Sequence, residues 1–336
     1  MFSAARFILV AWVGLALTVQ AAPAALDRCK RVQIGGLQYV RLRDWAGANR
    51  FDFAWVQPNK TLQLTGAGLK IVLTADSKLM LVSGVSLWLC HPVVVPADHN
   101  AYLSALDLKT ALTPLVAPPR HPAPIRLVAL DPGHGGRDRG FYKGARFEKN
   151  YTLLLAQEVR DQLAKAGVKA MLTRTKDEYV ERAARPELAR TRKADLFVSL
   201  HFNAANEGSK EAKGAEVYCM TPVGARSTNT EGANGNTGPE PGNIANDRNV
   251  VLAYLLQRAL VKTVRLDDRS VRRARFEVLR EATMPAALIE GGFLSHAEEG
   301  NRIADPAFRR KLARAIADGI LAYKRTVEPK VDTPKP

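Results

Sequence analysis

The stretch Leu130-Asp131-Pro132-Gly133-His134-Gly135-Gly136 decides the fold of this chain, because a mostly apolar run, residues 125–130, ends there in a glycine-rich turn that holds one histidine. Two later apolar runs end in a similar way. Residues 196–200 lead into His201, and residues 286–289 lead into Glu290. Open α/β folds place their sites at the carboxyl ends of such strands. The pattern therefore predicts that these three polar side chains meet at one edge of a sheet.

Strand-like and helical patterns alternate from residue 125 to residue 325, which predicts a doubly wound, largely parallel α/β sheet. Residues 221–242 are rich in Gly, Asn, Thr and Pro and lack apolar periodicity, so we expect a mobile loop beside the site. Residues 326–336 are polar, and we expect a disordered tail. The predicted strands are 125–131, 168–173, 195–201, 215–220, 276–279 and 286–290, and the predicted helices are 148–166, 178–192, 244–264 and 306–323.

The N-terminal part of the chain has a different composition. Residues 28–117 consist of short β-type segments separated by Gly, Asn and Asp, which predicts a smaller β-rich domain. Prolines in and around residues 118–124 indicate a stiff linker between this domain and the α/β domain at 125–325.

The first residues resemble an export signal. Arg6 precedes an apolar run at 7–19, which is shorter than the roughly 20 residues that a bilayer requires. Small or apolar residues then suit cleavage after Ala21, so we interpret 1–21 as a signal peptide. The alternative is an uncleaved N-terminal anchor. The expected location is the periplasm or cell envelope, with no stable membrane insertion after cleavage.

The chain is strongly basic, with 49 Lys and Arg against 33 Asp and Glu, a formal charge of +16. Nucleic acid would be the default partner of such a protein, but an exported protein rarely meets it. We therefore expect no nucleic acid and favour an anionic polymer of the cell envelope; the alternative is a charged surface that only aids solubility. Of the three cysteines, Cys29 and Cys90 could pair in an oxidising compartment, or all three could be unpaired.

A fourth polar residue, Glu148, opens the helical pattern 148–166 and can join the side chains at the strand ends. Two histidines and two carboxylates are the inventory of a catalytic zinc with three protein ligands, an open coordination position and a separate acid/base. Each residue alone has an ordinary alternative: a histidine that contacts backbone or phosphate, a hydrogen-bonded core histidine, a charge at a helix N-terminus, or a paired carboxylate in the core. These alternatives do not explain why the four residues converge.

Four segments in this order resemble the zinc-dependent N-acetylmuramoyl-L-alanine amidases of the third amidase type. The resemblance implies a phosphorylase/hydrolase-like fold, Zn²⁺ ligands at His134, Glu148 and His201, and Glu290 as the catalytic carboxylate. It also implies peptidoglycan as substrate, cleaved between N-acetylmuramic acid and the L-alanine of the stem peptide. The segments are Asp131 to Gly136, Glu148 to Asn150, Ser199 to Ala204 and Glu290 to Ser295.

The block 28–117 resembles the copper amine oxidase N-terminal-like module in the segment Val32 to Gly36, with Tyr39-Val40 and Tyr102. This resemblance implies a role in tethering or wall targeting, without copper.

Two other functions stay open at this point: a zinc peptidase or deacetylase that acts on the same polymer, and a wall-binding protein without catalysis. In related amidases a regulatory helix can occlude the zinc in the interval that corresponds to 221–242. Here the glycines and prolines leave no amphipathic run long enough for a helix, so an activator protein is not expected.

Overall fold

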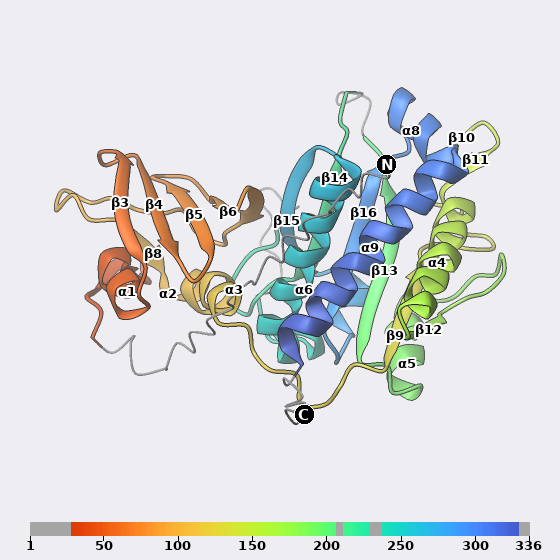
Figure 1. The fold of residues 1–336 in the computed structure, drawn as a ribbon, viewed down its shortest axis with the longest axis horizontal. Coiled ribbons are helices and arrows are strands. Elements are labelled where there is room, and N and C mark those ends of the chain that lie inside the picture. The colour runs from red at the N-terminus through yellow and green to blue at the C-terminus, as the bar shows by residue number, and fades with distance from the viewer. Residues whose placement is uncertain (1–27, 206–210, 229–236, 329–336) are drawn as a thin grey trace, which may run out of the picture.

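The computed structural model describes residues 28–205, 211–228 and 237–328, and the predicted signal peptide at 1–21 lies outside these ranges. One sheet of eleven strands runs through the molecule (Figure 1). In spatial order its strands are β12 (Lys169–Leu172), β9 (Leu127–Pro132), β13 (Leu196–Asn203), β16 (Ala286–Phe293), β14 (Ala215–Met220), β15 (Asp268–Ala274), β7 (Val85–Trp88), β6 (Leu79–Val82), β5 (Leu69–Thr74), β4 (Thr61–Gly66) and β3 (Asp52–Gln57).

The strand directions confirm a largely parallel α/β sheet for the C-terminal part. Strands β12, β9, β13 and β16 are parallel neighbours. Strand β14 runs antiparallel to β16, and β15 and β7 then follow parallel to β14. The carboxyl ends of β9, β13 and β16 therefore meet at one edge, as predicted from their sequence endings.

Helices cover the two faces of this sheet unequally. Inward side chains such as Val128, Val198 and Ile289 form the main core with α4 (Glu148–Lys165), α6 (Asn246–Ala259) and α9 (Pro306–Val327), which cross one face (Figure 1). Alternate residues point to the opposite face. There Phe197 and Leu288 pack in a smaller cluster with α5 (Ala184–Thr191) and α7 (Glu277–Arg280). The thinner cover on this second face leaves room for a pocket.

The N-terminal part is smaller and β-rich, as predicted. Beside the antiparallel strands β3 to β7 it has a second sheet of β1 (Arg31–Ile34), β2 (Leu37–Arg41) and β8 (Tyr102–Ser104). Three short helices accompany these strands: α1 (Leu42–Ala48), α2 (Ala105–Asp107) and α3 (Thr113–Val116). The remaining elements are a hairpin of β10 (Tyr142–Lys143) and β11 (Arg146–Phe147), the helical turns η2 (Leu108–Leu112), η4 (Pro241–Ala245) and η5 (Leu260–Val264), and helix α8 (Ala297–Ala304).

The main sheet continues from the α/β part into the N-terminal part without a gap. Leu87 of β7 lies in register with Val271 of β15, and the Ser86 amide donates to the Asp268 carboxylate at 2.7 Å. A hydrogen bond from the Tyr254 hydroxyl of α6 to the Val82 carbonyl, 3.2 Å, adds to this junction. The composition of the chain changes near residue 117, but the main sheet continues across the boundary between the two parts.

Three sequence predictions about elements are wrong. Residues 276–279 are not a strand: α7 lies there, and the strand is β15, whose Asp and Arg residues conceal its alternation. The predicted helix 178–192 is only α5, because the Val180 carbonyl accepts from the Arg185 guanidinium instead of a helical amide. Helix α9 extends to the buried Val327, so the tail predicted from 326 begins too early.

The predicted position of the loop 221–242 is also wrong for its described residues. Because β14 runs antiparallel to β16, its last residue, Met220, lies at the other edge of the sheet, away from Glu290. The loop starts there, and Arg275 holds it by donating to the carbonyls of Pro222 and Ala225 at 3.1 and 3.0 Å. Residues 229–236 lie outside the described ranges.

Two further observations concern the described ranges alone. The three cysteines are not joined by disulfides there. None of the helices in these ranges is long and apolar enough to cross a membrane.

Candidate metal and catalytic site

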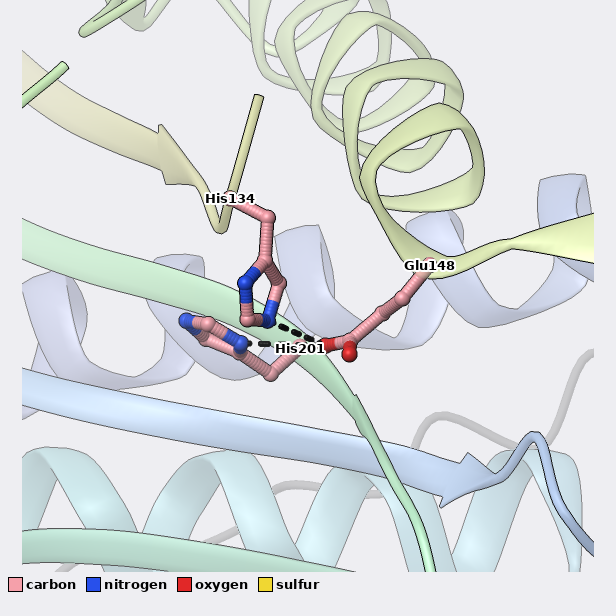
Figure 2. Close-up of side chains that lie close together, drawn as sticks. All are labelled: His134, Glu148 and His201. Carbon is pink, nitrogen blue, oxygen red and sulfur yellow. Dashed lines mark hydrogen bonds and ion pairs between the residues drawn. The ribbon is translucent and has the colours of Figure 1, made fainter. Parts of the chain in front are cut away.

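Three of the predicted site residues come together at the carboxyl edge of the sheet (Figure 2). His134 lies in the turn after β9, Glu148 is the first residue of α4, and His201 lies near the end of β13. One ligand atom from each residue lies within 4.8 Å of the other two. The Glu148 Oε1 atom is 3.1 Å from His134 Nε2 and 3.1 Å from His201 Nδ1.

The Glu148 carboxylate is held in its ionised form. Its side chain is buried, which opposes ionisation, but hydrogen bonds from His134 and His201 outweigh burial and keep its pKa well below the ordinary range. The amides of Phe141 and Phe202 also donate to this carboxylate, at 2.9 and 3.2 Å. A buried carboxylate with this many donors is fixed in place and in charge.

The His134 ring is oriented from behind by Asp138. Its Nδ1 lies 2.9 Å from Asp138 Oδ1 and its Nε2 lies 3.1 Å from Glu148 Oε1, so the ring is held between two carboxylates. With a metal ion bound, a proton kept on Nδ1 by Asp138 would leave Nε2 as the ligand atom. Burial lowers the pKa of His134, but its hydrogen bonds to Glu148 and Asp138 raise the pKa by a larger amount. The net effect is a pKa above the ordinary value. Sequence reasoning missed Asp138, although its position four residues after the histidine in the same turn was a usable signal.

The turn itself rests on a buried ion pair. Asp131 accepts from Arg185 at 2.9 Å and from the hydroxyls of Thr173 and Ser199 at 2.6 and 2.7 Å. Arg185 also donates to the His134 carbonyl at 2.9 Å. These contacts anchor the backbone of a residue whose φ of 61° is unusual for a non-glycine side chain.

The backbone of the turn approaches the His201 ring so closely that position 133 requires glycine. A Cβ atom on Gly133 would lie 2.2 Å from Cε1 of His201, which is far inside contact distance. Only glycine lets the turn and the β13 histidine share this space.

Glu290 lies next to these residues and has a different environment. It stands in register with His201 on β13 and with Glu216 on β14, and it lines the same pocket as His134 and His201. Its Oε2 atom is buried and has no hydrogen-bond partner in the described part of the chain. Burial, followed by the charges of Glu148 and Glu216, raises its pKa well above the ordinary value.

The neighbouring Glu216 has hydrogen-bond partners of its own. Arg269 donates to it at 2.6 Å and the Tyr218 hydroxyl donates at 2.6 Å. Two adjacent carboxylates thus differ in kind, since Glu216 is paired and Glu290 is poised to accept or release a proton. Sequence reasoning did not identify Glu216.

The pocket lies on the thinly covered face of the sheet and has a volume of about 330 Å³. His201, Leu288 and Glu290 line it from the sheet, Arg182 lines it near Asp138, and Phe276 lines it next to Tyr218 of β14.

The donor set fits a tetrahedral metal ion. Two imidazole nitrogens and one carboxylate oxygen are ligands that zinc prefers. Ligand atoms about 2.1 Å from a tetrahedral zinc lie about 3.4 Å from one another. The two 3.1 Å separations at Glu148 Oε1 are close to that value, so the three residues are a possible metal-binding group.

Comparisons with known proteins show which proteins this chain is similar to. The family model described as N-acetylmuramoyl-L-alanine amidase matches residues 128–322. The amidase AmiA of Salmonella typhimurium is 34% identical over 225 residues, which cover 59% of this chain and 76% of that protein. The amidase AmiC of Neisseria meningitidis is 34% identical over 227 residues, 60% of this chain and 53% of that protein. The solved structure of the amidase AmiC2 of Nostoc punctiforme superposes with a TM-score of 0.50 and 32% identity, and covers 60% of this chain and 97% of that one.

Proposed function

Since the chain belongs to the N-acetylmuramoyl-L-alanine amidase family, whose members hydrolyse peptidoglycan, we propose that it does so with one zinc ion held by His134, Glu148 and His201. The bond cleaved is the amide between N-acetylmuramic acid and the L-alanine of the stem peptide. One observation carries the proposal: two imidazoles and an ionised carboxylate converge beside Glu290, a second carboxylate with an unpartnered buried oxygen.

The residues divide the chemistry between them. A bound zinc ion supplies Lewis acidity, which polarises a carbonyl group and makes water acidic enough to lose a proton near neutral pH. Glu290 takes that proton during attack on the amide carbonyl and returns it to the leaving nitrogen. The return matters because an amide nitrogen is a poor leaving group until it is protonated. Asp138 holds His134 in the tautomer that directs Nε2 to the site.

The setting of the enzyme is part of the proposal. Residues 1–21 direct export to the periplasm or cell envelope, and the N-terminal part at 28–117 contributes wall targeting. The proposed reaction needs no activator protein.

Product analysis of digested sacculi tests the proposed reaction. We expect free lactyl carboxylates on the glycan, intact stem peptides and new amino termini on L-alanine. New amino sugars would indicate a deacetylase, and shortened stems would indicate a peptidase, and either result would contradict the amidase assignment. The Glu290→Gln protein, purified in the same way, controls for contaminating hydrolases.

A further inference from the structure

Arg182 is a cation at the pocket that the proposed chemistry does not use. It is exposed, lies just before α5 and lines the pocket on the side of the His134 turn. Its guanidinium makes no hydrogen bond or ion pair with the described residues. Its positive charge acts on Asp138, whose Oδ1 is already taken by His134 and by the Gly140 amide at 3.1 Å.

Four other cations around the turn are committed to protein groups. Arg185 is buried against Asp131, and Arg174 is buried and donates to the carbonyls of Pro132 and Gly133. Lys149 pairs with Asp177 at 2.6 Å. Arg137 pairs with Glu181 at 3.3 Å and stacks on Tyr179 at 4.0 Å from the ring centroid. Of these five cations, Arg182 alone has no protein group bound to its charged end in the described part of the chain. Its position in the pocket therefore favours an anionic group of a ligand as its partner.

The part of the pocket next to β14 carries the other sign of charge. Glu277, at the start of α7, lines that part next to Phe276. The Glu277 carboxylate would repel an anionic group of a bound ligand. Such a group would therefore bind near Arg182. The pocket therefore has a polarity that can orient an asymmetric substrate.

We propose that Arg182 binds the free α-carboxylate of the second stem residue and so makes the enzyme prefer stems in which this group is not amidated. This inference rests on the proposed function. In the peptidoglycan stem, L-alanine is followed by a glutamate joined through its side-chain carboxyl, which leaves an α-carboxylate one residue beyond the scissile amide. A guanidinium matches a carboxylate with two parallel hydrogen bonds, which a neutral amide cannot accept equally well.

Binding and turnover of two small substrates test the proposal on the full chain. The probes are N-acetylmuramoyl-L-alanyl-D-glutamate whose γ-carboxyl group is blocked as a methylamide, and the same compound with its α-carboxyl group also converted to an amide. The variants are Arg182→Gln, which removes the charge, and Arg182→Lys, which keeps it. Arg137→Gln is the matched control, because this neighbouring arginine is 74% exposed and does not line the pocket. Dissociation constants are measured by calorimetry in a Glu290→Gln background, so that binding is read without turnover.

We expect Arg182→Gln to weaken binding of the acid about tenfold, to leave binding of the amide within twofold, and to raise KM for the acid far more than it lowers kcat. Arg182→Lys should restore part of the loss, and Arg137→Gln should change neither compound. Equal weakening for acid and amide, or no change for the acid, would overturn the role of Arg182 while hydrolysis by the unmodified chain continued to support the amidase. Absence of hydrolysis of both compounds and of sacculi by the zinc-loaded unmodified chain would instead refute the proposed function.

Discussion

His134 has a left-handed backbone conformation and is held by three other residues. Its Nδ1 faces Asp138, its Nε2 faces Glu148, and its carbonyl accepts from Arg185. These contacts fix the position of its imidazole, and a fixed ligand side chain favours tight metal binding.

Replacing either histidine should remove the metal. We expect His134→Ala and His201→Ala to lower zinc occupancy and to abolish hydrolysis, because a site with two protein ligands binds weakly. Metal content by atomic emission and release of peptides from sacculi are the measurements. His99→Ala, at an exposed position, is the control and should keep both properties. Full zinc stoichiometry in both site variants would overturn the ligand assignment.

Replacing Glu290 should separate chemistry from metal binding. An amide keeps the shape of the side chain but cannot accept a proton, so Glu290→Gln should retain zinc while turnover falls by about 10² to 10⁴-fold. Parallel assays of metal content and kcat check this. Loss of zinc together with activity would make Glu290 a ligand rather than an acid/base.

The residue types and spacing allowed the four main side chains to be predicted, but not their supports. His134, His201 and Glu290 stand where apolar runs end, and a strand end is visible in a sequence. Asp138 and Glu216 act through partners that come from other turns and strands, such as Arg269 of β15. A single sequence does not show which distant side chains meet, so these contacts required the structure.

The glycine turn after β9 packs directly against the end of β13. Gly133 faces the ring of His201 with no space for a further carbon atom. Strand direction is a second property of the elements. The described residues between β13 and β14 contain no helix, and β14 enters the sheet antiparallel to β16. The sequence alternation predicted the strand 215–220 well but contained no signal for its direction, and the misplaced loop 221–242 follows from that.

A single methyl group in the turn should disturb the site. In Gly133→Ala the new Cβ would collide with the His201 ring, so we expect the ring to move and both zinc occupancy and activity to be largely lost, in a chain that still folds. Gly47→Ala in α1 is the matched control, because its Cβ would meet nothing within 4 Å and alanine favours a helix by about 0.5–1 kcal/mol. Metal content, activity and circular dichroism are measured for both. Normal zinc binding by Gly133→Ala would show that the contact is not restrictive.

At the scale of the whole molecule, the sheet joins two parts that differ in composition. Buried Arg273 of β15 donates to the Thr110 carbonyl of the N-terminal part at 2.8 Å. The proposed site, in contrast, is built from β9, β13, β16 and α4, and β14 and β15 separate it from β7. Stability and chemistry should therefore respond differently when the N-terminal part is removed.

We expect residues 118–328 alone to keep zinc and activity without an activator, but to melt at a lower temperature than residues 28–328. Losing even about 2 kcal/mol of contacts lowers Tm by about 4–8 °C in a domain of this size. Thermal unfolding followed by circular dichroism, with activity on sacculi, makes the comparison. An unchanged Tm would show that the strand junction adds no stability, and activity that appeared only after a partner protein was added would contradict the open-site proposal.

The central claim is that the His134, Glu148 and His201 group holds a zinc ion on which hydrolysis depends. The most direct test measures the metal content of the purified full chain and its activity on sacculi before chelation, after chelation and after zinc is returned. We expect one zinc per chain, loss of activity with the metal and recovery on addition of one equivalent of zinc, with Glu290→Gln binding zinc but not recovering activity. Full activity in the chelated, metal-free chain would contradict this claim.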